Sequence, residues 1–101
     1  MEHKSYVQLL TDEDKLKIEF TQDRGVIIKF VVQYYSLMAS RWRTVMRIDN
    51  CHGFAHRHVY HLQNKEYKVP LNKDANKAFT EAKAYIVKNL HVIKENFLFS
   101  K

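Results

Sequence analysis

Hydrophobic and polar residues alternate along much of the first two thirds of the chain, with the two-residue period of a half-buried β-strand. In residues 15–21, Leu16, Ile18 and Phe20 occupy one face and polar residues occupy the other. Residues 26–35 instead form a β-branched and aromatic run, typical of a central strand with both faces largely covered. These patterns predict strands at residues 15–21, 26–35, 42–49, 56–62 and 67–69.

Short segments separate the predicted strands, so we expect the strands to pair in chain order as an antiparallel meander. Gly25 closes the turn at residues 22–25, where it can adopt the positive φ angle that a tight turn requires. Residues 38–41 form a second predicted turn, although it contains no glycine. Residues 50–55 are expected to form a loop, and residues 63–66 another hairpin turn.

After Pro70 the apolar residues recur every three or four positions, which is the spacing of one stripe on an amphipathic helix. Asn72 or Asp74 can cap the start of this helix, and Pro70 ends the preceding strand. We therefore predict one helix over residues 73–97. It would pack on the sheet through Phe79, Ala82, Ile86, Leu90 and Ile93, against residues such as Ile18, Phe20 and Phe30.

Together these elements predict an α+β fold. An antiparallel four- to five-stranded β-meander over about residues 5–70 is followed by one long C-terminal helix packed on a sheet face. The 101 residues are the size of a single domain, residues 1–101.

The chain is basic, with 17 Lys and Arg against 11 Asp and Glu and a net charge of +6. Small basic domains often bind polyanions, although charge bears on association and not on fold. A single cysteine, Cys51, cannot form an internal disulfide, which fits a reducing cytoplasm. The polar N-terminus is no signal peptide and no apolar run has the length of a membrane span, so we expect a cytoplasmic protein without membrane contact.

The segment from Arg47 to His61 holds the chemistry that is most informative. It contains four of the six histidines together with two arginines, an aspartate and a tyrosine. Histidine suits proton transfer near neutral pH, and the arginine guanidinium matches the geometry of a phosphate. If the two strands flanking the loop pair as a hairpin, Arg47 and Asp49 lie across from His56 and His58, on one face with Tyr60. Arg57, Val59 and His61 would take the other face.

Three kinds of site are compatible with this cluster. In metal-independent RNA cleavage, one histidine removes a proton from the 2′-hydroxyl and another acid protonates the leaving oxygen. His56 or His58 would act as base or acid, Arg57 or Arg47 would hold the phosphate, and Tyr60 would position it. A zinc or transition-metal site could use Asp49, His52, His56 and His58, but the usual ligand spacings are missing.

The third kind of site binds nucleic acid without cutting it. Positive charge and stacking faces would come from Arg41, Arg43, Arg47 and Arg57 with Trp42, Tyr34 and Tyr35. Because Tyr34 and Tyr35 are adjacent in a strand, only one of them can join such a surface. In the plain structural alternative, the histidines hydrogen-bond to strand ends and to each other. Nothing in the spacing around Cys51 defines a nucleophile triad.

The same segment resembles a family of small prokaryotic proteins in which a strand ends in Arg-x-Asp and is followed by His-Gly and then His-Arg or His-Lys. It is also similar to the pattern of TumE-like toxins of toxin–antitoxin pairs, which are proposed RNA-targeting growth inhibitors. The resemblance covers about residues 23–97, and its most specific part is Arg47-x-Asp49-x-x-His52-Gly53-x-x-His56-Arg57. The site that it implies consists of Arg47, Asp49, His52, His56 and Arg57. Cys51 stands where a small residue such as alanine is expected, and His58 and His61 extend the pattern.

We therefore predict a small RNA-directed protein, a ribonuclease-type toxin or a relative of one, with a non-catalytic binding module and a metal-dependent enzyme as alternatives. The predicted catalytic residues are His52, His56, Arg57, His58 and Tyr60. Phosphate would be bound by Arg41, Arg43 and Arg47, and Asp49 would orient its neighbours. We expect no cofactor and no metal. RNA is the expected partner, and an antitoxin protein and a second copy of the chain are further candidates.

Overall fold

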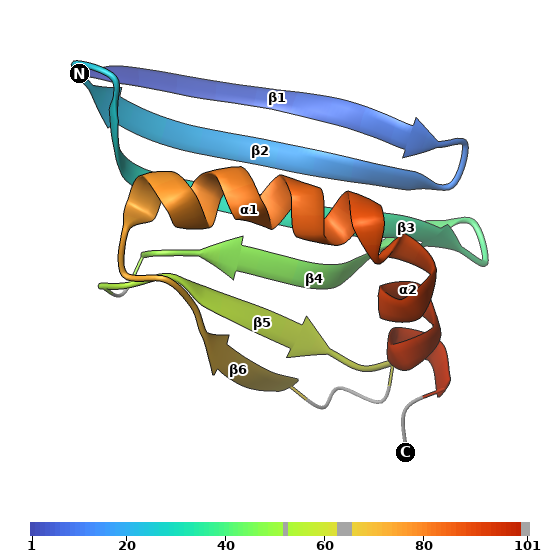
Figure 1. Ribbon diagram of the computed structural model, residues 1–101. Helices are drawn as coiled ribbons and strands as arrows, with labels where there is room; N and C mark the ends of the chain where they lie inside the picture. Colours follow the sequence, from blue (N-terminus) through green and yellow to red (C-terminus); the bar gives the residue numbers. More distant parts are fainter. Residues whose placement is uncertain (52, 63–65, 100–101) are drawn as a thin grey trace.

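Six antiparallel strands form one sheet in chain order, and two helices cross one of its faces (Figure 1). The computed structural model describes residues 1–51, 53–62 and 66–99. The strands are β1 (Glu2–Thr11), β2 (Asp14–Asp23), β3 (Val26–Met38), β4 (Arg41–Asp49), β5 (His56–Tyr60) and β6 (Glu66–Pro70). The helices are α1 (Ala75–Lys88) and α2 (Leu90–Phe99).

The predicted α+β class and the antiparallel meander are confirmed, but the sheet has one strand more than predicted. The additional strand is β1, at the edge next to β2. Nearly all its residues are exposed, including Leu9 at 71%. Because β1 buries neither face, its hydrophobic pattern contains little strand signal.

β3 lies in the middle of the sheet, but the helices cover only one of its faces. Phe30, Val32 and Tyr34 are buried on that face, whereas Val31 and Gln33 on the other face are partly exposed. The prediction that both faces of this strand are largely covered is therefore wrong. We call the face without helices the uncovered face.

Two tight turns bracket β3 in the described part of the chain. Arg24 and Gly25 have φ angles of 52° and 82°, which confirms the predicted role of Gly25. Ala39 and Ser40 make the turn into β4 with φ angles of 51° and 65°. Positive φ at two successive residues is the geometry of a two-residue hairpin turn that matches strand twist. The second turn therefore forms without glycine, at some conformational cost.

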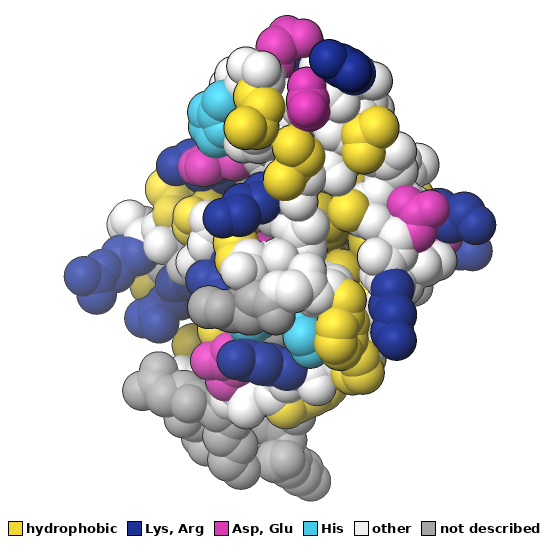
Figure 2. Space-filling view, turned by 90° about the vertical axis from the view of Figure 1, so that its left-hand side faces the viewer, with side chains coloured by type: hydrophobic (Ala, Val, Ile, Leu, Met, Phe, Trp, Pro, Cys, Tyr) yellow, Lys and Arg dark blue, Asp and Glu magenta, His cyan; other side chains and the backbone are white. Residues whose placement is uncertain are grey.

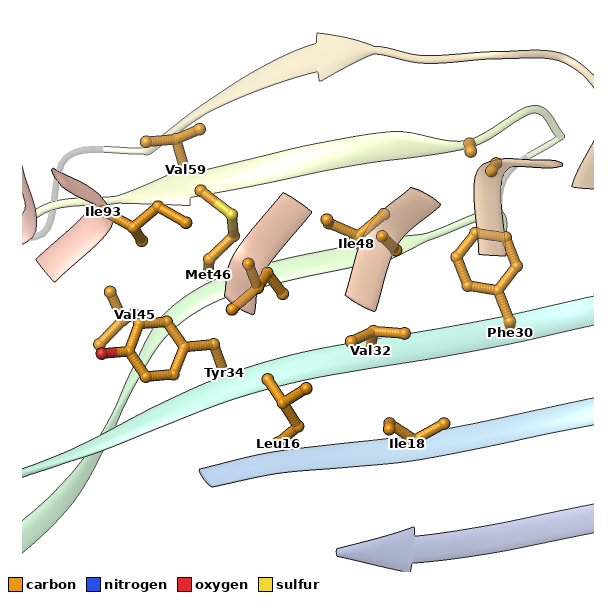
Figure 3. Packing of buried hydrophobic residues seen from close by; sticks show 14 of the residues in the cluster. Leu16, Ile18, Phe30, Val32, Tyr34, Val45, Met46, Ile48, Val59 and Ile93 are labelled. Atoms are coloured by element: carbon orange, nitrogen blue, oxygen red, sulfur yellow. The ribbon is translucent and has the colours of Figure 1, made fainter. Parts of the chain in front are cut away.

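The hydrophobic core lies between the helices and the covered face of the sheet (Figure 3). Alternate residues of β2, β3 and β4 supply its sheet side, among them Leu16, Ile18, Val32 and Ile48. The helices contribute Ala78, Ala82, Ile86, Ile93 and Phe97. Burial of these apolar surfaces is the main driving force that holds the two layers together.

α1 begins and packs as predicted. Asp74 caps its start, because its Oδ1 accepts hydrogen bonds from the backbone N–H groups of Asn76 and Lys77 at 2.9 and 3.4 Å. The ring of Phe79 lies 5.1 Å from that of Phe20 and 5.3 Å from that of Phe30. The predicted contact between helix and sheet is therefore confirmed at this end.

The prediction of one unbroken helix over residues 73–97 is wrong, because the helix breaks at Asn89. The carbonyl of Tyr85 accepts from both the backbone N–H of Asn89 (3.0 Å) and its side-chain amide (2.8 Å). A side chain that competes for a backbone acceptor in this way disfavours the helical conformation. α2 therefore leaves in a new direction, toward β4 (Figure 1). Within the described residues, neither helix has the length and apolarity needed to cross a membrane.

Candidate functional site

The hairpin of β4 and β5 brings together the residues that the sequence pattern singles out. Arg47 lies directly opposite His58, and Asp49 lies directly opposite His56. The alternate residues of the two strands, such as Met46 and Val59, point into the core instead. The predicted approach of Arg47 and Asp49 to His56 and His58 is confirmed, and all four side chains are on the uncovered face.

His58 is the centre of a buried ionic network. Its Nε2 lies 3.1 Å from Oδ2 of Asp49, and its Nδ1 lies 3.0 Å from Oε1 of Glu66. Oδ2 of Asp49 also accepts a hydrogen bond from Nε of Arg47 at 2.8 Å. His58 and Asp49 are only 3% and 2% exposed. Each ring nitrogen of His58 therefore contacts one carboxylate.

This network occupies both ring nitrogens of His58, so neither is free to exchange a proton with a substrate. Asp49 is equally committed, since its Oδ1 accepts from the backbone N–H of Cys51 at 3.1 Å. The orienting role that we predict for Asp49 agrees with these contacts. For His58, the geometry agrees better with a structural role than with acid–base chemistry.

Glu66 completes the network and is the residue that sequence reasoning missed. It belongs to the segment predicted as a turn, yet it is the first residue of β6 and pairs with Tyr60. Lys68, two residues later, pairs with His58. The charged residues Glu66 and Lys68 alternate with Tyr67, as expected for a strand. This alternation could have placed the Glu66 carboxylate on the same face of the sheet as His58.

His56 and Tyr60 are half-buried on the uncovered face, on either side of His58. The ring of His56 lies 4.6 Å from the ring of Phe54, and the rings of His58 and Tyr60 stack at 6.5 Å. Burial raises the pKa of the Tyr60 hydroxyl above its ordinary value, although the nearby Arg47 acts in the opposite direction. Tyr60 is therefore a hydrogen-bond donor at neutral pH.

Arg57 does not join these residues, because it lies on the covered face of the sheet. It pairs with Ile48 and Val69, and its guanidinium stacks over the ring of Tyr85 at 4.4 Å. The prediction that Arg57 takes the face opposite His56 is confirmed, so Arg57 cannot hold a phosphate together with His56, and of the two predicted clamps only Arg47 lies on the histidine face. Neighbouring residues in a strand point to opposite faces, so a His-Arg pair cannot present both side chains to one site.

A β-bulge changes the predicted faces of the first half of β4. Tyr34 pairs with Met46 and Tyr35 pairs with Thr44, which leaves Val45 as an extra residue, buried in the core. Trp42 and Thr44 consequently share the uncovered face with Arg47. Arg41 and Arg43 fall on the side of the covered face, so the prediction that they form one phosphate-binding surface with Arg47 is wrong.

Cys51 and His52 border the cluster in the loop after β4. His52, a predicted catalytic residue, lies outside the described residues. Partial burial and the nearby Asp49 raise the pKa of the Cys51 thiol, while Arg47 opposes them, so the thiol is not activated as a nucleophile. In residues 1–51, 53–62 and 66–99, no group of three or more His, Cys, Asp or Glu side chains is arranged to hold a metal ion.

Basic and aromatic side chains continue from the histidine cluster across the uncovered face. The ammonium of Lys15 lies 4.0 Å from the ring centre of Trp42 and 5.9 Å from that of Tyr35. The hydroxyl of Tyr35 donates to Gln33, which pairs with Arg47. In the end-on view of Figure 2, several Lys and Arg side chains project from the left flank, away from the helices.

Register places a line of polar residues directly across five strands of this face. Lys17 pairs with Gln33, Gln33 with Arg47, Arg47 with His58, and His58 with Lys68. We call these five residues the basic row. At about 4.8 Å per strand, the row is about 19 Å long. It combines three permanent cations with one buried histidine.

Comparisons with known proteins give a family without an established activity. No curated protein and no solved structure matches the chain. The whole chain, residues 1–101, matches the model of a family described as Domain of unknown function (DUF7718). The chain therefore belongs to the DUF7718 family.

Proposed function

We propose that the uncovered face of the sheet binds single-stranded RNA. The observation that carries this proposal is the basic row, with Trp42 and Tyr35 beside it on the same face. Lys17, Arg47 and Lys68 can contact successive phosphates, while the aromatic rings offer stacking surfaces for bases. Sheet surfaces that combine cations with aromatic side chains bind single-stranded RNA in this way.

The charges of this face favour a polyanion over other partners. Its acidic residues Glu19, Asp49 and Glu66 are paired with Lys17, Arg47 and His58, whereas Lys15 and Lys68 form no ion pair among the described residues. The net charge of +6 adds a general attraction to phosphate. The resemblance of residues 47–57 to TumE-like toxins, which are proposed to target RNA, agrees with this choice of ligand.

Binding fits the geometry better than cleavage does. Two proton-transferring groups must reach one phosphate, and His56 and His58 are about 7 Å apart along β5. His58, however, is 3% exposed and paired with two carboxylates. The half-buried His56, beside Arg47 and Asp49, supports cleavage as a second candidate, with growth inhibition as the cellular effect.

Fluorescence anisotropy with a labelled single-stranded RNA tests the binding proposal. Lys17→Ala and Lys68→Ala should each reduce the salt dependence of binding by about one phosphate contact. Trp42→Ala should cost about 1–3 kcal/mol of binding free energy through lost stacking. Lys77→Ala is the matched control, because Lys77 is an exposed lysine on α1 and should leave binding unchanged.

If Lys17→Ala, Lys68→Ala and Trp42→Ala all bind like the wild type, the uncovered face is not the RNA site. The same RNA, analysed on a denaturing gel, separates binding from cleavage. If the wild type cleaves the RNA, and His56→Ala loses cleavage while its thermal midpoint stays nearly unchanged, the protein is a ribonuclease. If the RNA stays intact with the wild type, the protein is a binding module.

A further inference from the structure

A second site lies on the opposite side of the sheet, beneath α1. A cavity of about 190 Å³ is lined by Ile48, Arg57, Leu71, Ala78, Glu81, Ala82 and Tyr85. Most of this lining is apolar, and an engineered apolar cavity of about 150 Å³ is large enough to hold benzene. The cavity therefore has room for a small ring or a short aliphatic chain.

Arg57 gives this cavity a fixed positive charge. Its guanidinium lies 4.4 Å from the ring centre of Tyr85, and such stacking sets the plane of the group. Its Nε is buried and has no hydrogen-bond partner among the described residues. None of the ion pairs formed within those residues involves Arg57.

A buried donor without an acceptor is costly, and native proteins rarely keep one without a reason. We propose that this cavity binds a small carboxylate with an apolar body. The apolar part would lie against Ile48, Leu71 and Ala82, and the carboxylate would pair with the guanidinium of Arg57, which has no ion-pair partner among the described residues. This ligand differs from RNA in size and in the face that it occupies.

Glu81 defines the selectivity of the site. It is an exposed residue that also lines the cavity, and its negative charge opposes an anionic ligand. A ligand with several negative charges would be repelled more strongly, and a free phosphate would have no use for the apolar lining. The site therefore selects a monoanion with an apolar group.

Titration of the full chain with benzoate and with its neutral counterpart benzamide tests this inference, using amide chemical shifts as the readout. Benzoate should cause saturable shifts at Ala78, Ala82 and Tyr85, and benzamide should bind about tenfold more weakly, because it lacks the charge-assisted hydrogen bonds. Arg57→Gln should weaken benzoate about tenfold and leave benzamide unchanged. Arg43→Gln, at an exposed arginine outside the cavity, is the control.

Three results would overturn the inference: no saturable shift at these residues, equal affinity for benzoate and benzamide, or unchanged benzoate affinity in Arg57→Gln. The comparison of the two probes uses only the wild type, so it holds even if the Arg57 variant does not fold. Trp42→Ala should bind benzoate normally. Failure of the RNA proposal therefore leaves this one untouched, and the reverse is also true.

Discussion

Two buried carboxylates, Asp14 and Asp49, show how the same group can have different consequences in one small domain. Oδ1 of Asp14 accepts from the hydroxyls of Tyr34 (2.6 Å) and Ser36 (2.8 Å), and Oδ2 accepts from Thr11 (2.7 Å). Asp49 instead faces two charged or chargeable groups, Arg47 and His58. Three hydroxyl groups supply the short side-chain contacts of Asp14, whereas a guanidinium and an imidazole supply those of Asp49.

The two clusters also lie on different faces of the sheet. Asp14 pairs with Ser36 on the covered face, where Tyr34 and Ser36 are fully buried and Lys94 joins the cluster to α2 at 3.6 Å. The Asp49 cluster lies on the uncovered face and ends in Arg47 and Glu66, whose side chains are 35% and 42% exposed. A ligand on the uncovered face can therefore contact the second cluster but not the first. We infer that Asp14 serves stability and that the Asp49 cluster can serve recognition.

Removal of each carboxylate should give the largest measurable contrast. Asp14→Ala removes three hydrogen bonds and leaves the buried Tyr34 hydroxyl without its acceptor, although Ser36 still reaches the carbonyl of Glu13, and it should lower the free energy of unfolding by about 3–5 kcal/mol. Asp49→Ala should cost less, about 1–3 kcal/mol, because water can hydrate Arg47 and Glu66 still pairs with His58. Urea unfolding measures both values.

Asp12→Ala is the control for this pair, because Asp12 is exposed in the turn between β1 and β2 and its loss should change stability by less than about 0.5 kcal/mol. Equal losses for Asp14→Ala and Asp49→Ala would show that hydration of Arg47 does not reduce the cost of removing Asp49.

The Asp14 cluster should make the free energy of unfolding depend on pH in both acidic and alkaline solution. Burial acts to raise the pKa of Asp14, but hydrogen bonds from Tyr34, Thr11 and Ser36 together with Lys94 bring it below its ordinary value. The folded state then binds this proton less readily than the unfolded state. The contribution of Asp14 is therefore present above about pH 4 and is lost as the pH falls through the folded pKa.

Tyr34 behaves in the opposite sense, because burial and the neighbouring Asp14 raise the pKa of its hydroxyl. Its contribution is present below about pH 10 and is lost as the pH rises further toward the folded pKa. The free energy of unfolding, measured by urea titration across the pH range, should fall at both extremes. Each group can contribute at most about 1.4 kcal/mol per pH unit. A profile for Asp14→Ala that is as steep in acid as the wild type would contradict this assignment.

Glu66→Gln should give the smallest effect on stability and the clearest effect on recognition. The side chain is 42% exposed, so its pair with His58 should contribute less than about 1 kcal/mol to folding. Loss of one negative charge beside the basic row should strengthen RNA binding slightly. Anisotropy titrations at low salt measure the change; unchanged binding would place RNA away from Glu66, and weaker binding would show that the contact of Glu66 with His58 supports the RNA site.

The sequence allowed much of the fold to be predicted, because buried faces leave periodic patterns. β2 and α1 alternate clearly between core and solvent, and both were located correctly. β1 escaped because it buries almost nothing. The break at Asn89 depends on hydrogen bonds to the carbonyl of Tyr85, which the apolar stripe does not reflect.

The candidate site was predictable only where successive side chains of a strand alternate strictly between the two faces of the sheet. Pairing of Arg47 and Asp49 with His58 and His56 followed from the hairpin, and this part is confirmed. The bulge at Val45 reversed the faces of the preceding residues, which a two-residue period cannot anticipate. The alternation of side chains also predicts Arg57 on the face opposite His56, which is confirmed, and Arg57 enters the predicted site through its charge and the resemblance to a His-Arg motif.

The order of the elements along the chain also determines how the molecule must fold. Every strand pairs with its chain neighbour, so the sheet can grow hairpin by hairpin through local contacts, which generally form rapidly. α1 packs against β3 only after all six strands have been made, and the bond from the backbone N–H of Ile27 to Asn76 joins residues 49 positions apart. During synthesis, the apolar side of the sheet therefore stays exposed until the helices emerge from the ribosome. This interval is when the nascent chain is most prone to aggregate or to be bound by a chaperone.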